Sequence, residues 1–287
     1  MTRIILSAMW LVHRLRLSTL RRIGAALGLA LLVFAGRRRR IAHANLRACF
    51  PAMGGGERAT LVRSAFTHLG KGLMDRAVLW HGSRERIRRL VRIEGEAHLL
   101  ALRGQPVILL APHFTGLDAG GARLMLDHRI SSIYSNQKDP RFNQALLAGR
   151  TRFNDSVILS RQDGVRAALR VLREGLPFYY LPDMDLGARG AVFAPFFGVP
   201  AATVTAVSRL ARLSGARVLP CVTRMTDDGY TMTIHPPWDA FPGPGEIDDA
   251  TRMNAFIEAE VRAMPAQYHW LHRRFKTRPA GAQRIYD

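Results

Sequence analysis

Between residues 106 and 265 the chain alternates short apolar runs with longer segments in which apolar residues recur at helical spacing. Strands alternating with helices indicate an α/β fold. The runs are apolar almost throughout, which predicts a sheet covered by helices on both faces. The expected strands are 106–111, 129–135, 156–160, 177–182, 216–225 and 230–236. The expected helices are 116–126, 140–153, 163–175, 202–215 and 250–265.

The first 40 residues differ from the rest, because two apolar runs are separated and then followed by arginines. The runs are residues 4–12 and 23–36, and four consecutive arginines occupy 37–40. Neither run reaches the roughly 18 to 20 uninterrupted apolar residues of a spanning helix. The arginines stand where a signal peptide would carry its cleavage site, which argues against export. We expect residues 1–40 to anchor the protein at the cytoplasmic face of a membrane, ahead of one domain over 41–287. Buried core helices and a cleaved signal peptide are the alternatives.

The chain is strongly basic, with 42 lysine and arginine residues against 22 acidic ones and a formal net charge of +20. Such a surplus predicts an anionic partner, which can be a nucleic acid, an anionic membrane or an acidic protein. No nucleic-acid-binding module is recognisable, so nucleic acid is not the expected partner. The two cysteines, Cys49 and Cys221, lie far apart without metal-ligand spacing and are expected to be reduced thiols.

A histidine and a carboxylate stand where the first predicted strand gives way to a helix. Pro112 ends the strand, His113 follows, and Asp118 falls in the first turn of the next helix. Residues five apart on one continuous helix face apart, so these two can meet only if His113 precedes the helix. An imidazole with a carboxylate in reach suits a general base and its orienting partner. The residues alone leave open a second interpretation, a buried histidine satisfied by a helix-start aspartate.

Arginines gather around the predicted strand at 156–160. Arg150, Arg152, Arg161 and Arg166 are interleaved with this strand and the next helix start. Guanidinium groups bind phosphates and carboxylates in bidentate fashion, so the set could hold an anionic substrate. A solvated basic face is the alternative.

The segment after the strand at 177–182 combines acidic, basic and aromatic residues. Asp183, Asp185 and Arg189 come first, and three phenylalanines at 193, 196 and 197 follow. An Asp-x-Asp pair can bind a divalent metal with a nucleotide sugar, which keeps a glycosyltransferase as an alternative. The aromatic residues suggest either an apolar slot or part of the core.

Other catalytic signatures are missing from the sequence. We find no nucleophile elbow, Walker loop, zinc-protease motif or dinucleotide fingerprint. His269 and His272 lie three apart, but no carboxylate or cysteine accompanies them. The sequence therefore predicts neither a metal nor a cofactor.

Several spaced motifs together resemble one family, the bacterial lipid A late acyltransferases, which are the lauroyl and myristoyl transferases of lipopolysaccharide synthesis. The resemblance extends from about residue 38 to residue 279. The segments that carry it are NLRACFP (45–51), HFTGLD (113–118), NQKDPRFNQALLAGRTRF (136–153), LPDMDLGARGAVFAPFFGVPAAT (181–203) and QYHWLHRRFKTRP (267–279).

The resemblance implies a glycerolipid-acyltransferase-like fold with a mixed central sheet, and it implies acyl transfer at the bacterial inner membrane. The family's H-x4-D/E motif falls on His113 and Asp118, which makes them the expected catalytic pair. Acyl-carrier-protein thioester is the implied donor, and a Kdo-bearing lipid A precursor is the implied acceptor. The other expected substrate-binding residues are Arg150, Arg152, Arg161, Asp183, Asp185 and Arg189.

Three alternatives stay open at this point. The acceptor could be another membrane lipid, such as a lysophospholipid or an aminolipid. A metal-dependent membrane glycosyltransferase could use Asp183 and Asp185. A non-enzymatic basic protein that coats a membrane would need neither His113 nor Asp118.

Overall fold

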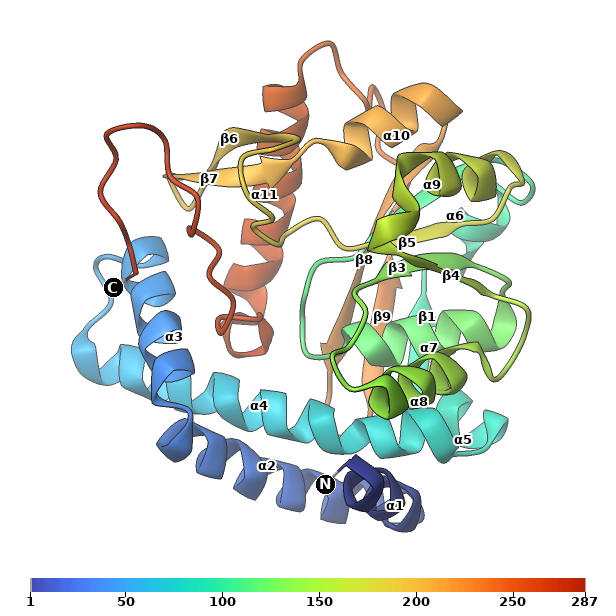
Figure 1. Ribbon diagram of the computed structural model, residues 1–287, viewed down its shortest axis with the longest axis vertical. Helices are drawn as coiled ribbons and strands as arrows, with labels where there is room; N and C mark the ends of the chain where they lie inside the picture. Colours follow the sequence, from blue (N-terminus) through green and yellow to red (C-terminus); the bar gives the residue numbers. More distant parts are fainter. Residues whose placement is uncertain (1, 287) are drawn as a thin grey trace.

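The computed structural model describes residues 2–286 and has one seven-stranded sheet flanked by helices (Figure 1). The strand order is β1-β9-β8-β2-β5-β3-β4. Strands β8 and β9 are antiparallel and the other neighbours are parallel, so the predicted α/β fold with a mixed central sheet is confirmed. The strands are β1 (Val91–Glu94), β2 (Val107–Leu110), β3 (Ser131–Tyr134), β4 (Val157–Ser160), β5 (Phe178–Tyr180), β8 (Arg217–Met225) and β9 (Tyr230–Ile234).

Helices cover the sheet on both faces and extend beyond it on the N-terminal side. The helices are α1 (Thr2–Val12), α2 (Leu17–Phe34), α3 (Gly36–Cys49), α4 (Gly55–His81), α5 (Arg84–Leu90), α6 (Glu96–Leu100), α7 (Leu117–Asp127), α8 (Pro140–Thr151), α9 (Gly164–Arg173), α10 (Ala206–Ser214) and α11 (Glu246–Ala263). Two short 3-10 turns, η1 (Arg161–Asp163) and η2 (Pro265–Gln267), are also present.

The central strand β2 explains why its apolar run is continuous. Each of its four side chains is at most 1% exposed. Alternate residues point to opposite faces, so Leu109 belongs to the core cluster that includes Leu124 of α7, while Leu110 belongs to the cluster that includes Leu172 of α9. The sheet is therefore covered on both faces at β2, as the sequence predicts for this run, whereas the edge strands β1 and β4 keep partly exposed residues.

The predicted helix at 202–215 is wrong in its first part. Residues up to Val204 belong to a separate antiparallel hairpin, β6 (Ala191–Phe196) and β7 (Val199–Val204), and α10 begins only at Ala206. Gly198, with a φ of 74°, turns the hairpin at a conformation that favours glycine. The Phe196 side chain on this hairpin is fully buried against Tyr268 and Phe275, so it belongs to the core.

The N-terminal segment forms longer helices than its apolar runs suggest. Helix α2 has 18 residues and is long and apolar enough to cross a membrane by length and composition. It joins the second apolar run to the more polar residues before it. The boundary expected after residue 40 falls inside α3.

Helix α2 lies along α4, on the side of α4 that faces away from the sheet (Figure 1). Arg21 of α2 is only 8% exposed, and its guanidinium pairs with the Asp75 carboxylate of α4 at 3.4 Å. Arg21 also donates to the carbonyl of Gly229 at 2.8 Å, and the Tyr230 hydroxyl donates to Asp75 at 2.6 Å. Removing one partner from a buried ion pair costs about 3 to 5 kcal/mol, so this network fastens α2 to the domain.

Candidate active site

His113 and Asp183 meet at the carboxyl edge of the sheet because they follow neighbouring parallel strands at the same distance. Leu110 of β2 is the register partner of Tyr180 of β5. His113 comes three residues after Leu110, and Asp183 comes three residues after Tyr180. In both loops a proline, Pro112 or Pro182, precedes the polar residue. Two matched strand ends therefore deliver an imidazole and a carboxylate to one point.

The Asp183 carboxylate holds His113 with both oxygens. One oxygen accepts from the His113 backbone N–H at 3.0 Å, and the other lies 2.6 Å from the ring Nδ1. A carboxylate accepts the Nδ1 proton, so Nε2 is the basic nitrogen of the neutral ring. The Asp183 side chain is 1% exposed and that of His113 is 21% exposed, which leaves the imidazole partly open to the cleft.

The pKa of the Asp183 carboxyl results from opposing effects. Burial by itself raises the pKa, but the charge and the two hydrogen bonds of His113 hold it well below its ordinary value. Asp183 is therefore an anion beside the imidazole. This geometry is the one that stabilises an imidazolium.

The expected contact between Asp118 and His113 is not formed, and this corrects the sequence-based pairing. The Asp118 carboxylate accepts from Arg76 Nε of α4 at 2.7 Å and from Arg150 Nη2 of α8 at 2.8 Å. The residue lies in the first turn of α7, as expected, where the helix dipole also favours a negative charge. From that turn its side chain reaches α4 and α8 rather than the loop of His113.

Two arginines set the ionisation of Asp118. Burial raises the pKa of this carboxyl, but the charges of Arg76 and Arg150 and their hydrogen bonds hold it well below its ordinary value. The three side chains together carry one net positive charge. They form a cationic part of the same cleft lining as His113.

The cleft around His113 is lined by polar and apolar groups from several elements. Arg76, Arg150 and Asp118 contribute to one wall, and His269 follows η2 on another. Burial and the charges of His113 and His272 lower the pKa of His269 to about 3, so this second imidazole is neutral near pH 7. The cleft consists of two adjoining pockets. The residues that line both pockets are Arg76, His113, Arg150, Leu181 and Met184.

The four candidate arginines do not converge. Arg150 lines both pockets of the cleft, whereas Arg161 lines only one of them, together with Tyr180. Arg152 instead donates to the carbonyl of Gly82 at 2.5 Å and stacks on the Phe153 ring at 4.0 Å. Arg189 is an exposed residue before β6 and lies outside the cleft lining.

Asp183 and Asp185 point in different directions, so they do not form a shared metal site. The Asp185 carboxylate accepts from the Thr277 backbone N–H at 2.6 Å and from the Gly187 N–H at 3.0 Å. The Asp185 N–H donates to His272 Nε2 at 2.9 Å. Asp185 thus secures the loop that carries Asp183. Across residues 2–286 no group of three or more His, Cys, Asp or Glu side chains is placed to hold a metal.

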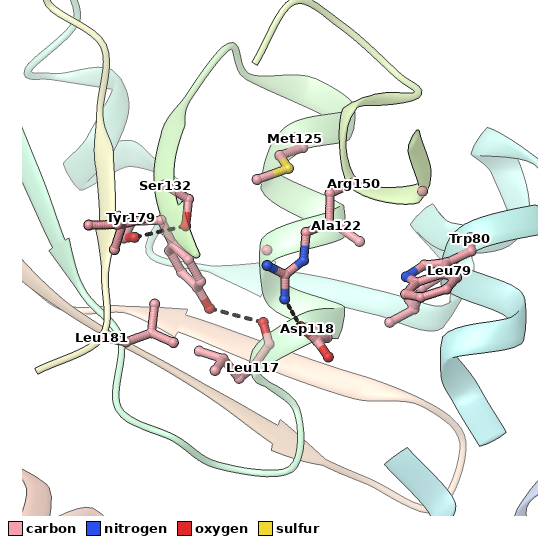
Figure 2. Close-up of a pocket in the computed structure, with 13 residues that line it drawn as sticks. Leu79, Trp80, Leu117, Asp118, Ala122, Met125, Ser132, Arg150, Tyr179 and Leu181 are labelled. Carbon is pink, nitrogen blue, oxygen red and sulfur yellow. Dashed lines mark hydrogen bonds and ion pairs between the residues drawn. The ribbon is translucent and has the colours of Figure 1, made fainter. Parts of the chain in front are cut away.

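A narrow, largely apolar cavity of about 50 Å³ adjoins the Asp118–Arg150 pair. Figure 2 shows Leu79, Trp80, Ala122 and Met125 around it, with Arg150 and Asp118 joined by a hydrogen bond. The same pair lines the cleft, so cavity and cleft are neighbours separated by an ion pair.

The sequence model of the bacterial lipid A biosynthesis acyltransferases matches residues 1–277. The chain belongs to this family. It is 35% identical over 286 residues to the lipid A biosynthesis lauroyltransferase of Escherichia coli K12, which covers 98% of this chain and 93% of that protein. The identity to the palmitoleoyltransferase of the same organism is 32%, over 98% of this chain and 92% of that protein. To its myristoyltransferase the identity is 32%, over 88% and 81%.

Among solved structures, the 1-acyl-sn-glycerophosphate acyltransferase PlsC of Thermotoga maritima aligns with 17% identity and a TM-score of 0.43, over 88% of this chain and 99% of that chain. The sequence relatives are lipid A acyltransferases, so this family member is an acyltransferase of lipid A biosynthesis. The resemblance seen in the sequence motifs is confirmed.

Sequence reasoning missed two features of this candidate site. Arg76 lies within the long helix α4, and nothing in its neighbourhood marks it as a cleft residue. Asp183 was expected to bind substrate, whereas it is the partner of the histidine. The signal for the second feature is the repeated pattern of an apolar strand, a proline and a polar residue at Pro112 and Pro182.

Proposed function

We propose that this protein transfers a fatty acyl chain from acyl-carrier-protein thioester to a hydroxyl of a Kdo-lipid IVA type precursor, with His113 as general base. The observation that carries the proposal is the Nδ1 contact of His113 with Asp183 at 2.6 Å. It makes Nε2 the basic nitrogen beside the cleft, as a general base requires. Asp183 replaces Asp118 as the residue that orients the base.

The chemistry follows from this arrangement without a covalent acyl-enzyme. His113 Nε2 takes the proton of the acceptor hydroxyl as its oxygen attacks the thioester carbonyl carbon. The C–O bond forms, the C–S bond breaks, and the leaving thiolate takes the proton from Nε2. Asp183 stabilises the imidazolium in between. The amino end of α7 and the net positive cluster around Asp118 supply charge for the oxyanion.

The apolar cavity behind the Asp118–Arg150 pair suits the hydrocarbon tail of the donor. Its walls come mainly from Leu79, Trp80, Ala122 and Met125, and it adjoins the cleft in which the thioester must lie. Burial of apolar surface favours a tail in such a cavity. We assign part of the acyl chain to this cavity, whose volume of about 50 Å³ is smaller than a whole chain.

Charge supports the assignment of both substrates and of the location. A lipid A precursor carries phosphates and sugar carboxylates, and Arg76, Arg150 and Arg161 stand along the cleft to meet them. An acidic carrier protein suits a chain of net charge +20. Together with the apolar N-terminal helices, these features support a position at the cytoplasmic face of the inner membrane.

The test is a reconstituted reaction with purified protein, acyl-carrier-protein thioester and Kdo-lipid IVA, with products measured by mass spectrometry. His113→Ala should lower kcat by about 10² to 10⁴. His128→Ala is the matched control, because His128 also pairs with a carboxylate (Glu96, 2.7 Å) but lies outside the cleft lining. Equal activity of His113→Ala and the parent would show that His113 is not the general base. Acylation of a lysophospholipid but not of Kdo-lipid IVA would overturn the acceptor.

A further inference from the structure

The outer face of α1 and α2 exposes large apolar side chains. In α2 they follow the helical repeat on the face opposite α4, and in Figure 1 both helices lie on the outside of the molecule, beneath α4. Phe34 is 86% exposed and Leu11 is 67% exposed. The exposed large apolar residues of the two helices are Ile4, Ile5, Trp10, Leu11, Ile23, Leu27, Val33 and Phe34.

The opposite face of α2 is joined to α4 at backbone contact. A Cβ added at Gly24 would lie 2.6 Å from the Cα of Lys71, and one at Gly70 would lie 2.1 Å from the carbonyl oxygen of Gly24. A Cβ at Gly28 would lie 2.2 Å from the carbonyl oxygen of Phe66. The glycines therefore allow an approach that no other residue permits.

The buried Arg21–Asp75 ion pair also joins α2 to α4. For α2 to cross a bilayer as a separate helix, it would have to leave α4. Asp75, which has no exposed surface, would then lose its charge partner, and Arg21 would enter the hydrocarbon region. A docked α2 keeps both groups paired and still offers its apolar face to lipid.

A basic hollow begins where the apolar face ends. Residue 36 starts α3 directly after α2, and α3 turns away from the line of α2 (Figure 1). The hollow has a volume of about 390 Å³ and lies between α3 and the C-terminal segment. Within residues 2–286 none of its arginines forms an ion pair with a carboxylate. Its charged lining residues are Arg37, Arg39, Arg40, Arg47 and Arg273.

We propose that the protein docks in a single leaflet of an anionic bilayer, with α2 lying in the membrane plane against α4 and the basic hollow of α3 taking lipid headgroup phosphates. Exposed apolar residues on one side of α2, followed directly by arginines at the start of α3, suit an interfacial helix. The partner of this surface is lipid rather than a second copy of the chain. The exposed apolar residues of α2 are followed by the arginines of the hollow, which have no carboxylate partner within residues 2–286, and an anionic bilayer offers both hydrocarbon and negative charge. The proposal rests on the membrane location in the proposed function but not on its chemistry.

Accessibility of introduced cysteines tests the orientation. Cys49 and Cys221 are buried, so the parent chain serves as the unlabelled control. Arg16→Cys precedes α2, Arg37→Cys follows it, and Leu213→Cys marks the side of the catalytic domain. With a membrane-impermeant maleimide, all three should be labelled in inverted inner-membrane vesicles and none in intact spheroplasts. Labelling of residue 16 or residue 37 from the spheroplast side means that α2 spans the membrane, which overturns the proposal.

Vesicle binding by the full chain tests the two parts of the surface separately. Phe34→Glu should abolish flotation with phosphatidylglycerol vesicles, whereas Leu213→Glu, which also alters an exposed apolar residue, should not. The pair Arg37→Gln/Arg40→Gln should weaken binding to phosphatidylglycerol vesicles about 25-fold, because each basic residue near an anionic surface contributes about fivefold. Its binding to pure phosphatidylcholine vesicles should stay the same.

Three results overturn the proposal. They are equal loss on both lipids, a loss of affinity for the carrier protein in place of lipid, and a change of oligomeric state in Phe34→Glu without loss of flotation. The reaction is followed in parallel with detergent-solubilised substrates. If Phe34→Glu loses flotation but keeps turnover, membrane docking is separate from acyl transfer. If the parent protein binds vesicles but shows no turnover, the proposed function is contradicted and the docking proposal is not.

Discussion

Two carboxylates near the cleft differ in burial and in their partners: the Asp183 side chain is 1% exposed, and that of Asp118 is 23% exposed. Asp183 lies in the loop after β5 and contacts the His113 imidazole, and among residues 2–286 no arginine lies within hydrogen-bonding distance of its carboxylate. Asp118 begins a helix and is held by two guanidinium groups. Both have a pKa below the ordinary value, but for different reasons. The comparison teaches that spacing to the histidine in sequence does not choose its partner, whereas the strand or helix end on which the carboxylate stands does.

Replacing each carboxylate by an amide tests the difference between Asp183 and Asp118, and the largest expected effect is on kcat. Asp183→Asn should lower kcat by about 10³ to 10⁴, because the amide cannot stabilise the imidazolium of His113. Asp118→Asn should act mainly on KM, with a loss of about tenfold to a hundredfold in kcat/KM, since it leaves Arg76 and Arg150 without their counter-charge. Steady-state kinetics of both variants decides. A larger kcat effect at Asp118 than at Asp183 would reverse the assignment.

The arginines beside Asp118 give the next largest effect. Arg150→Ala should raise the KM of one substrate about tenfold to a hundredfold, because charge-assisted hydrogen bonds contribute about 1.5 to 3 kcal/mol. Arg152→Ala is the matched control, since Arg152 contacts Gly82 and Phe153 outside the cleft. KM is measured with each substrate varied in turn at two salt concentrations. Equal KM effects at both positions would mean that position in the cleft does not matter.

The cavity behind the Asp118–Arg150 pair predicts a change of acyl-chain preference. Ala122→Leu should fill part of the cavity and shift the preference toward a shorter chain, with about a tenfold change in the ratio of kcat/KM for two donors. Gly121→Ala adds one methyl group at ordinary contact distance from Tyr179, so its shift should be smaller. Competition between donors of different length measures the ratio. An unchanged ratio in Ala122→Leu would place the tail elsewhere.

Acid stability is expected to show the smallest effect. In the folded protein the pKa of Asp118 is below the ordinary value of about 3.9, so its stabilisation is present above about pH 4 and is lost as the pH falls further. Asp118→Asn should therefore lose more free energy of unfolding at pH 7 than at pH 3.5, relative to the parent. Urea denaturation at both pH values measures the difference. The same deficit at both pH values would mean that the carboxylate charge adds no stability.

Much of the fold is local and follows from the sequence. The apolar run at 106–111, the break at Pro112 and the helix that begins at Leu117 all result from neighbouring residues, and the structure places them within a residue or two of the prediction. The hairpin β6–β7 was missed because its strands pair only with each other and then pack against α11, which a helical reading of the alanine-rich stretch cannot anticipate.

The sequence by itself determined the α/β class, the basic character, the family and the position of His113. Only the tertiary structure decided which carboxylate meets that histidine, because Asp183 is 70 residues away and arrives through the parallel pairing of β2 with β5. The tertiary structure also decided that α2 lies against α4, because the close approach at Gly24, Gly28 and Gly70 and the burial of Arg21 depend on two helices that are distant in the chain. Local sequence patterns predict the secondary structure that a segment prefers. Which side chains contact each other depends on which distant segments strand pairing and helix packing bring together.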